Sequence, residues 1–306
     1  MTGPELAGIR ACVFDAYGTL LDLAAAGRRC AEILGDKADR VNEVWRTKQI
    51  SWTWHLNSMG VYRDFWRITE DSLDVALHDS GIWSESGRAR LLAQYRVLDP
   101  YPDVAPALER LRGAGLRTAV LSNGTEEMVR VALGAGRLTG LVDAVCSADH
   151  ARVFKPHPNV YRLACDALGE PAHALCFVSS NYWDVAGASI FGFPTVWLNR
   201  TGQRPEPLPG RPTATIARAN SAELSRLRMN APLPHFTSST NPSTLAASFF
   251  DRMLATISGR QDTVAVTSRN AYNFLSAGAI SGVAPVMQQP TWSVTRTSSA
   301  SERSVR

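Results

Sequence analysis

The stretch from Ala11 to Leu21 constrains the fold of this chain more than any other. Its apolar residues, Ala11 to Phe14, lead directly to an acid, Asp15, and the chain then turns at Gly18. An apolar run that does not alternate is typical of a strand in a parallel sheet, because helices cover both faces of such a sheet. Asp15 therefore follows the carboxyl end of a buried strand, where open α/β sheets place their ligand sites. The plainer interpretation is that this acid only caps a helix.

Three later stretches also carry polar residues at or after an apolar run. Residues 120–124 read VLSNG, residues 154–158 read FKPHP, and residues 176–184 read CFVSSNYWD. Around them, helical and strand-like patterns alternate along the chain. The helical segments are 104–111, 126–133, 159–168 and 183–191, and the strand segments are 116–121, 141–146, 175–178 and 195–198. We expect 195–198 to be the final strand, because a Pro- and Gly-rich loop follows at 201–211.

This alternation predicts an α/β fold, namely a Rossmann-like, doubly wound, mainly parallel sheet with helices on both faces. The polar residues that follow its strands should meet at one edge of the sheet. Lys155 lies in an apolar setting and is one of only three lysines in the chain. A buried role for Lys155 is therefore expected, and a solvated surface lysine is the alternative.

Composition limits the other classes of protein. The chain has 306 residues, 45% hydrophobic and 20% charged, enough for a sizeable core and one or two domains. It has no apolar run long enough for a membrane span and no signal-peptide core at its start, so a cytoplasmic protein is expected. Five cysteines without metal-site spacing suit reduced thiols. Of the net charge of +4, residues 231–306 carry +3, so nucleic acid is not an implied partner.

The segment from residue 22 to residue 100 differs from the rest, because its pattern is helical and no strand interrupts it. It holds five of the eight tryptophans, for which plain core packing is the simplest interpretation. Arg46 and Ile50 are four residues apart and share one helical face. We expect an inserted helical domain.

Taken in order, the motifs at Asp15, 122–124, 155–158 and 179–184 resemble those of the haloacid dehalogenase superfamily. The details DAYGT, SNG, KPHP and SSNxxD resemble its type II branch, the (S)-2-haloacid dehalogenases, and the resemblance runs from about Ile9 to Leu227. It implies an α/β core (1–21 and 101–228) with a helical cap (22–100). The Ser/Thr-rich remainder, 229–306, should be largely disordered with one short helix.

The resemblance also implies roles for individual residues. Asp15 would be the nucleophile, Lys155 would pair with it, and Arg46 and Asn123 would bind the halide. Thr19 and Ser179 would orient the carboxylate or cap helices, and Asp184 would help to activate water or cap its helix. The catalytic set is Asp15, Thr19, Arg46, Ser122, Asn123, Lys155, Tyr161, Ser179, Asn181 and Asp184. The substrate-binding set is Ala16, Tyr17, Arg46, Ile50, Phe65, Ser122, Asn123 and Trp183.

The residue at position 17, here Tyr17, distinguishes the activities found in this superfamily. Phosphatases of the superfamily carry an acid there, which protonates the leaving alcohol and supports Mg²⁺. A halide leaves without a proton, so tyrosine suits cleavage of a carbon–halogen bond. The resemblance thus implies hydrolytic dehalogenation of short (S)-2-haloacids to (R)-2-hydroxyacids and halide through an aspartyl ester, with no cofactor, no metal, no membrane partner and a homodimeric state. A phosphatase with an altered metal loop and a non-catalytic binding protein are the alternatives.

Overall fold

The computed structural model of the chain describes Leu6 and residues 8–217, which all belong to one compact unit, Met1–Asp262. The predicted tail, 229–306, and its predicted short helix lie outside the described residues. No helix among the described residues is long and apolar enough to cross a membrane.

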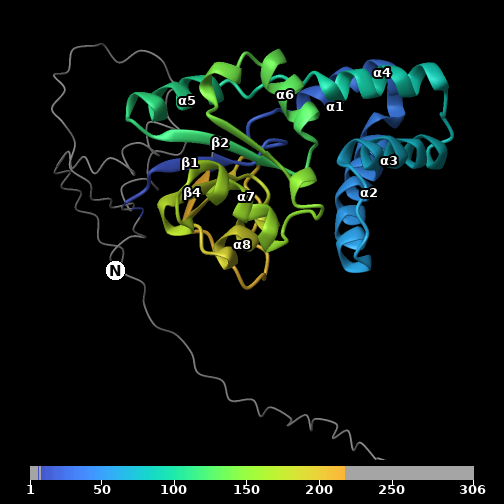
Figure 1. Cartoon of the computed structure of the whole chain (residues 1–306). Helices are drawn as coiled ribbons and strands as arrows, with labels where there is room; N and C mark the ends of the chain where they lie inside the picture. The colour runs from blue at the N-terminus through green and yellow to red at the C-terminus, as the bar shows by residue number, and fades with distance from the viewer. Residues whose placement is uncertain (1–5, 7, 218–306) are drawn as a thin grey trace, which may run out of the picture. The chain divides into compact units, whose positions relative to one another are not determined.

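A six-stranded sheet forms the centre of this unit, and every pair of neighbouring strands runs parallel (Figure 1). The predicted α/β fold class is therefore confirmed. The strand order is β3-β2-β1-β4-β5-β6, so the direction of strand addition reverses beside β1. The strands are β1 (Ala11–Phe14), β2 (Arg117–Ser122), β3 (Ala144–Ser147), β4 (Leu175–Ser179), β5 (Thr195–Asn199) and β6 (Ala214–Ala217).

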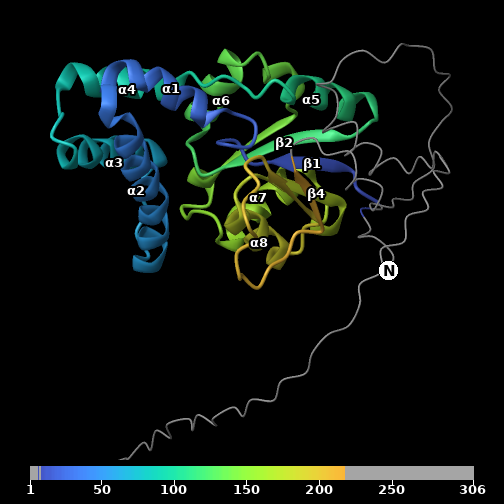
Figure 2. The same cartoon turned by 180° about the vertical axis from the view of Figure 1, so that it is seen from behind.

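Helices cover both faces of the sheet. One side carries α5 and α6, and the other side carries α7 and α8 (Figures 1 and 2). Right-handed crossovers explain this arrangement, because the chain adds strands in one direction from β1 to β3 and in the opposite direction from β3 to β6. The long helices are α1 (Leu23–Leu34), α2 (Ala38–Met59), α3 (Phe65–Asp79), α4 (Glu85–Arg96), α5 (Val104–Gly113), α6 (Glu126–Ala135), α7 (Pro158–Leu168) and α8 (Tyr182–Phe191), and short 3-10 turns are Gly35–Lys37, Thr139–Leu141, Ala148–His150 and Ala172–Ala174.

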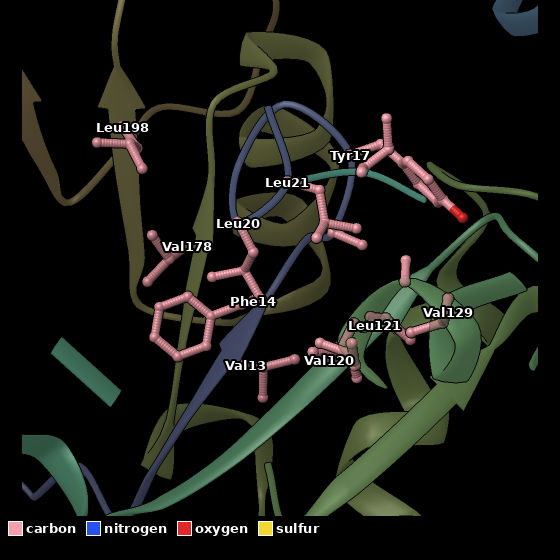
Figure 3. Close-up of a cluster of buried hydrophobic side chains, with 14 of the residues drawn as sticks. Val13, Phe14, Tyr17, Leu20, Leu21, Val120, Leu121, Val129, Val178 and Leu198 are labelled. Atoms are coloured by element: carbon pink, nitrogen blue, oxygen red, sulfur yellow. The ribbon is translucent and has the colours of Figure 1, made fainter. Parts of the chain in front are cut away.

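The core is centred on β1, whose four side chains are at most 1% exposed. Figure 3 shows Val13 and Phe14 of β1 among Val120 of β2, Val178 of β4 and other apolar side chains. A strand buried on both faces and bonded on both edges is rigid. Asp15, the next residue, therefore projects from the firmest part of the sheet, at the point where the strand order reverses.

Helices α1 to α4 pack on one another and hold none of the six strands. Leu21 and Pro100 form an isolated antiparallel bridge, so the chain enters and leaves this helical segment side by side. Gly60 ends α2 in the left-handed conformation (φ 66°), and the Asp64 side chain caps α3 by accepting a bond from the Arg67 N–H. This arrangement agrees with an inserted helical cap, whose exact boundaries stay a prediction.

Two expectations about the chain need correction. Residues 195–198 are not the final strand, because β6 follows the predicted loop and pairs with β5. Its short segment, ATIA, lies beyond a Pro-rich loop and has no distinctive periodicity. Not every cap tryptophan is core: Trp45 is 4% exposed, whereas Trp54 and Trp83 are 39% and 43% exposed.

Candidate active site

Asp15 lies just beyond β1 with its carboxylate held by three side chains. Its Oδ2 accepts bonds from Thr19 Oγ1 at 2.9 Å and Asn181 Nδ2 at 3.0 Å, and its Oδ1 accepts one from Lys155 Nζ at 3.1 Å. Asp15 is 7% exposed and caps no helix, since α1 begins only at Leu23. Oδ1, with one donor against two on Oδ2, keeps more unused acceptor capacity toward a substrate.

Lys155 is buried between two carboxylates. Its Nζ donates to Asp15 Oδ1 at 3.1 Å and to Asp184 Oδ2 at 2.8 Å, and the side chain is 1% exposed. Burial lowers the pKa of Lys155, but the two carboxylates more than offset this, so its pKa is raised from the ordinary value. The ammonium therefore stays charged, and the alternative of a solvated surface lysine does not hold.

Asp184, on the first turn of α8, is fully buried and does not act as a simple cap. Its Oδ1 accepts a bond from Tyr161 Oη at 2.9 Å, and its Oδ2 accepts the one from Lys155. Burial is the largest influence and raises the pKa of Asp184 to about 6; Lys155 lowers it and Asp15 raises it. Gly187 permits this packing, because a Cβ there would lie 2.7 Å from Tyr161 Oη.

The hydroxyl of Ser179 is linked to the Asp15 carboxylate through Asn181, and not directly as expected. It accepts a bond from the Asn181 N–H at 3.1 Å, and it is Asn181 that donates to Asp15. Ser180, which sequence reasoning missed, donates its N–H to Thr19 Oγ1 at 2.9 Å. Thr19 thus bonds directly to the carboxylate, while Ser179 is linked to it through Asn181.

The loop after β2 brings Ser122 and Asn123 to the same edge of the sheet. Ser122 Oγ accepts the Gly124 N–H at 3.0 Å, which leaves its hydroxyl hydrogen able to donate elsewhere. Asn123 Oδ1 accepts the Lys155 N–H at 2.9 Å, so its donor toward a bound anion is Nδ2. A Cβ at Gly124 would lie 2.9 Å from the Tyr17 ring, so this loop and the loop containing Ala16 and Tyr17 meet closely.

Arg46 extends from the middle of α2 into a polar network of the cap. Its Nη1 donates to Gln49 Oε1 at 3.1 Å, and Gln49 Nε2 donates to Thr69 Oγ1 at 2.7 Å and Tyr95 Oη at 3.1 Å. Gln49 is fully buried. Tyr95 stacks on Tyr17 with ring centroids 5.7 Å apart, so this network reaches the loop that carries Asp15.

The aromatic members of the predicted substrate-binding set contact rings outside that set. Tyr17 stacks on Tyr95, Trp183 meets Trp54 edge to face at 5.6 Å, and Phe65 lies 6.1 Å from the Phe154 ring. Ile50 is half-buried against the core. Arg46 also borders a cavity of about 490 Å³ between α1, α2 and α4 that is lined by no other residue of the predicted substrate-binding set.

Several residues of the site carried no sequence signal. Gln49 lies on α2 and Tyr95 on α4 at positions without a distinctive sequence pattern, and Asn57 lies near a helix end. Tertiary packing identifies them: Gln49 and Tyr95 are buried and bonded to each other, and Asn57 bonds to Phe154.

The donor set around Asp15 differs from what a divalent cation needs. Within the described part of the chain, no three His, Cys, Asp or Glu side chains are placed to hold a metal ion. The ammonium of Lys155 lies between the two carboxylates, and Tyr17 supplies no carboxylate. These residues do not fit a Mg²⁺ site, which wants several oxygen ligands in octahedral geometry.

Comparison with known proteins agrees with this geometry. The family model described as haloacid dehalogenase-like hydrolase matches residues 9–192. The (S)-2-haloacid dehalogenase 4A of Burkholderia cepacia is 45% identical over 199 residues, which is 65% of this chain and 86% of the relative. These matches confirm the resemblance drawn from the motifs.

Solved structures give the same result. A crystal structure of a dehalogenase with an intermediate complex is 41% identical, with a TM-score of 0.68 over 71% of this chain and 96% of that one. The L-2-haloacid dehalogenase of Xanthobacter autotrophicus with chloropropionic acid covalently bound is 35% identical, with a TM-score of 0.64 over 68% of this chain and 94% of that one.

Proposed function

Because the chain belongs to the haloacid dehalogenase-like hydrolases, we propose that it hydrolyses short (S)-2-haloacids to (R)-2-hydroxyacids and halide, with inversion at the α-carbon. The observation that carries this proposal is Asp15, held by Lys155, Thr19 and Asn181, beside Tyr17 where a phosphatase needs an acid. The relatives named above, which are 2-haloacid dehalogenases, support the same reaction.

The first step is nucleophilic substitution by Asp15. Oδ1 attacks the α-carbon opposite the halogen, a carbon–oxygen bond forms, and the carbon–halogen bond breaks with its electron pair leaving on the halide. Arg46 and Asn123 Nδ2 stabilise the departing anion. Ser122 and the N–H groups of Ala16 and Tyr17 bind the substrate carboxylate. Fixed donors that meet charge as it develops lower the barrier more than they strengthen substrate binding.

The second step is hydrolysis of the aspartyl ester. A water near Asp184 attacks the ester carbonyl, and Asp184 accepts its proton. The bond between the carbonyl carbon and the ester oxygen breaks, and Asp184 returns its proton to that oxygen as the hydroxyacid leaves. Asp15 is restored as a carboxylate when the second proton of the attacking water is lost to solvent. Lys155 donates to Asp184 as well as to Asp15, and Tyr161 holds Asp184 in place. Only the first step touches the α-carbon, so a single inversion results.

Turnover should depend on the ionised form of Asp184. Its raised pKa, about 6, means that the carboxylate gains a proton as pH falls below that value and can no longer accept one from water. We expect kcat to fall by about tenfold per pH unit on the acid side of this pKa and to level off above it. A profile of kcat from about pH 4.5 to 8 checks this, and a kcat that stays constant to the acid end would contradict the assignment.

Halide release should not require a divalent metal, because the donor set around Asp15 does not fit one. Chloride release from (S)-2-chloropropionate is expected to be unchanged by a chelator. Loss of activity with the chelator, restored by Mg²⁺, would favour the phosphatase-like alternative. No release under either condition, together with no phosphatase activity, would favour a non-catalytic protein. The homodimeric state and the cytoplasmic location stay predictions.

A further inference from the structure

The loop that carries Lys155 is bonded to the cap through one side-chain amide. Asn57, in the last turn of α2, donates from Nδ2 to the Phe154 carbonyl at 2.8 Å and accepts the Phe154 N–H on Oδ1 at 2.9 Å. The two bonds join residues 97 positions apart and engage both backbone groups of the residue that directly precedes the buried lysine, whose carbonyl also accepts the His157 N–H at 3.0 Å. A primary amide matches a peptide group here because it offers one donor and one acceptor side by side.

The ring of Phe154 is also held by side chains of the α2–α3 segment. It is fully buried, stacks on Tyr62 with centroids 5.2 Å apart, and lies 6.1 Å from Phe65. Tyr62 in turn donates a hydrogen bond to Asp149 and lies under the Arg152 guanidinium at 4.1 Å. The chain around Phe154 is therefore fixed by the α2–α3 segment in both its backbone and its side chain.

Asn57 also shares a helix with Arg46. The two residues lie 11 positions apart on α2, which is about three helical turns. Bonds at the end of a rigid helix set where the rest of that helix lies against the partner element. Asn57 consequently couples the position of Arg46 in the cap to the position of Lys155 in the core.

We propose that Asn57 is a positioning residue: its amide fixes the Phe154 backbone, places Lys155 Nζ against Asp15 and Asp184, and sets α2 so that Arg46 faces the reacting centre. The effect on turnover rests on the proposed dehalogenation, whereas the anchoring of Phe154 does not. Misplacement of a reacting group by about 1 Å can cost roughly a hundredfold in rate.

Two substitutions test this role. Asn57→Ala removes both bonds, and we expect kcat to fall by about ten- to a hundredfold with a smaller change in KM. Asn57→Asp keeps the acceptor but loses the donor while its carboxylate is ionised. Once protonated, that carboxyl group offers an O–H to the Phe154 carbonyl. The ratio of kcat for Asn57→Asp to kcat for Asn57→Ala should therefore rise as pH falls, and the acid loss from Asp184 cancels in this ratio.

Controls separate positioning from folding. Ser58→Ala, at the exposed neighbouring position, should leave kcat and melting temperature unchanged. Hydrogen exchange of the Phe154 and Lys155 amides should become faster in Asn57→Ala, measured well below the melting temperature. Should Asn57→Ala fail to fold, the ratio of kcat for Asn57→Asp to kcat for the wild type, in which the acid loss from Asp184 also cancels, decides the question by rising as pH falls.

The outcomes are distinct. An active wild type with an equally active Asn57→Ala, or unchanged exchange at Phe154, would overturn the proposal. A wild type that releases no halide would instead overturn the proposed function, and the exchange measurement would still show whether Asn57 anchors Phe154.

Discussion

Lys155→Met is expected to lower kcat for halide release by roughly a thousandfold, the upper range seen when one fixed electrostatic partner is removed from an active site. Lys155 is the ammonium that lies within hydrogen-bond distance of both Asp15 and Asp184. Methionine keeps most of the side-chain volume but leaves two buried carboxylates near each other without that cation. One of them then takes up a proton. A protonated Asp15 does not attack the substrate, and a protonated Asp184 does not accept a proton from water, so one of the two steps stops.

The same substitution should destabilise the fold in a pH-dependent way. Removing one partner of a buried ion pair costs about 3–5 kcal/mol. Burial raises the pKa of Asp184 and Lys155 lowers it, so without Lys155 the folded-state pKa of Asp184 lies further above its unfolded value. The stability of Lys155→Met should then be greatest in acid and decline as pH rises through that folded-state pKa.

Urea unfolding of Lys155→Met and wild type at about pH 5 and pH 8 measures the difference. Lys48→Met, the same change at a half-buried lysine of α2, is the matched control and should affect neither turnover nor the pH trend. A folded Lys155→Met enzyme with wild-type turnover would show that Lys155 serves neither step.

Arg46→Lys is expected to lower kcat by about a hundredfold while the melting temperature stays near that of the wild type. Gln49 Oε1 accepts one guanidinium N–H, which orients the planar fork. Lysine presents a single mobile ammonium, so it cannot contact Gln49 and a departing halide with the same geometry. The halide gains its charge as the carbon–halogen bond breaks, so the loss should appear in kcat more than in KM.

Arg40→Lys provides the control for this experiment, because Arg40 lies on the same helix, is exposed and pairs only at the surface with Glu43. Its kcat should be unchanged. Equal turnover by Arg46→Lys and wild type would exclude Arg46 as a residue that binds the departing halide.

The site residues at the ends of strands could be predicted from sequence, because each of them stands at the end of an apolar run. Asp15 and Ser122 are of this kind, and the parallel sheet brings them to one edge. Lys155 and Asp184 lie on loops and helix starts, and their positions came from the family resemblance, while their shared ion pairs needed the fold.

Other parts could not be predicted because they depend on packing rather than local pattern. Gln49 occupies a helical position indistinguishable from a surface glutamine until α3 and α4 cover it. Asn57 reads as a residue near a helix end, and its bonds to Phe154 join distant segments. Ser179 was assigned to Asp15 by its place in a motif, yet its hydroxyl bonds to Asn181. The β6 strand has four residues and pairs only with β5, so its sequence carries little signal.

The source of the product oxygen tests most directly whether Asp15 is the nucleophile. Asp15 would occupy the line opposite the halogen, so water would reach only the ester carbonyl, near Asp184. A single turnover in heavy-oxygen water with enzyme in excess should then give unlabelled hydroxyacid and leave the label in Asp15, and later turnovers should transfer that label to product. Asp15→Asn cannot decide the matter, because it would be inactive under either mechanism. Labelled hydroxyacid in the first turnover would contradict the covalent mechanism and would make Asp15 the base that activates water.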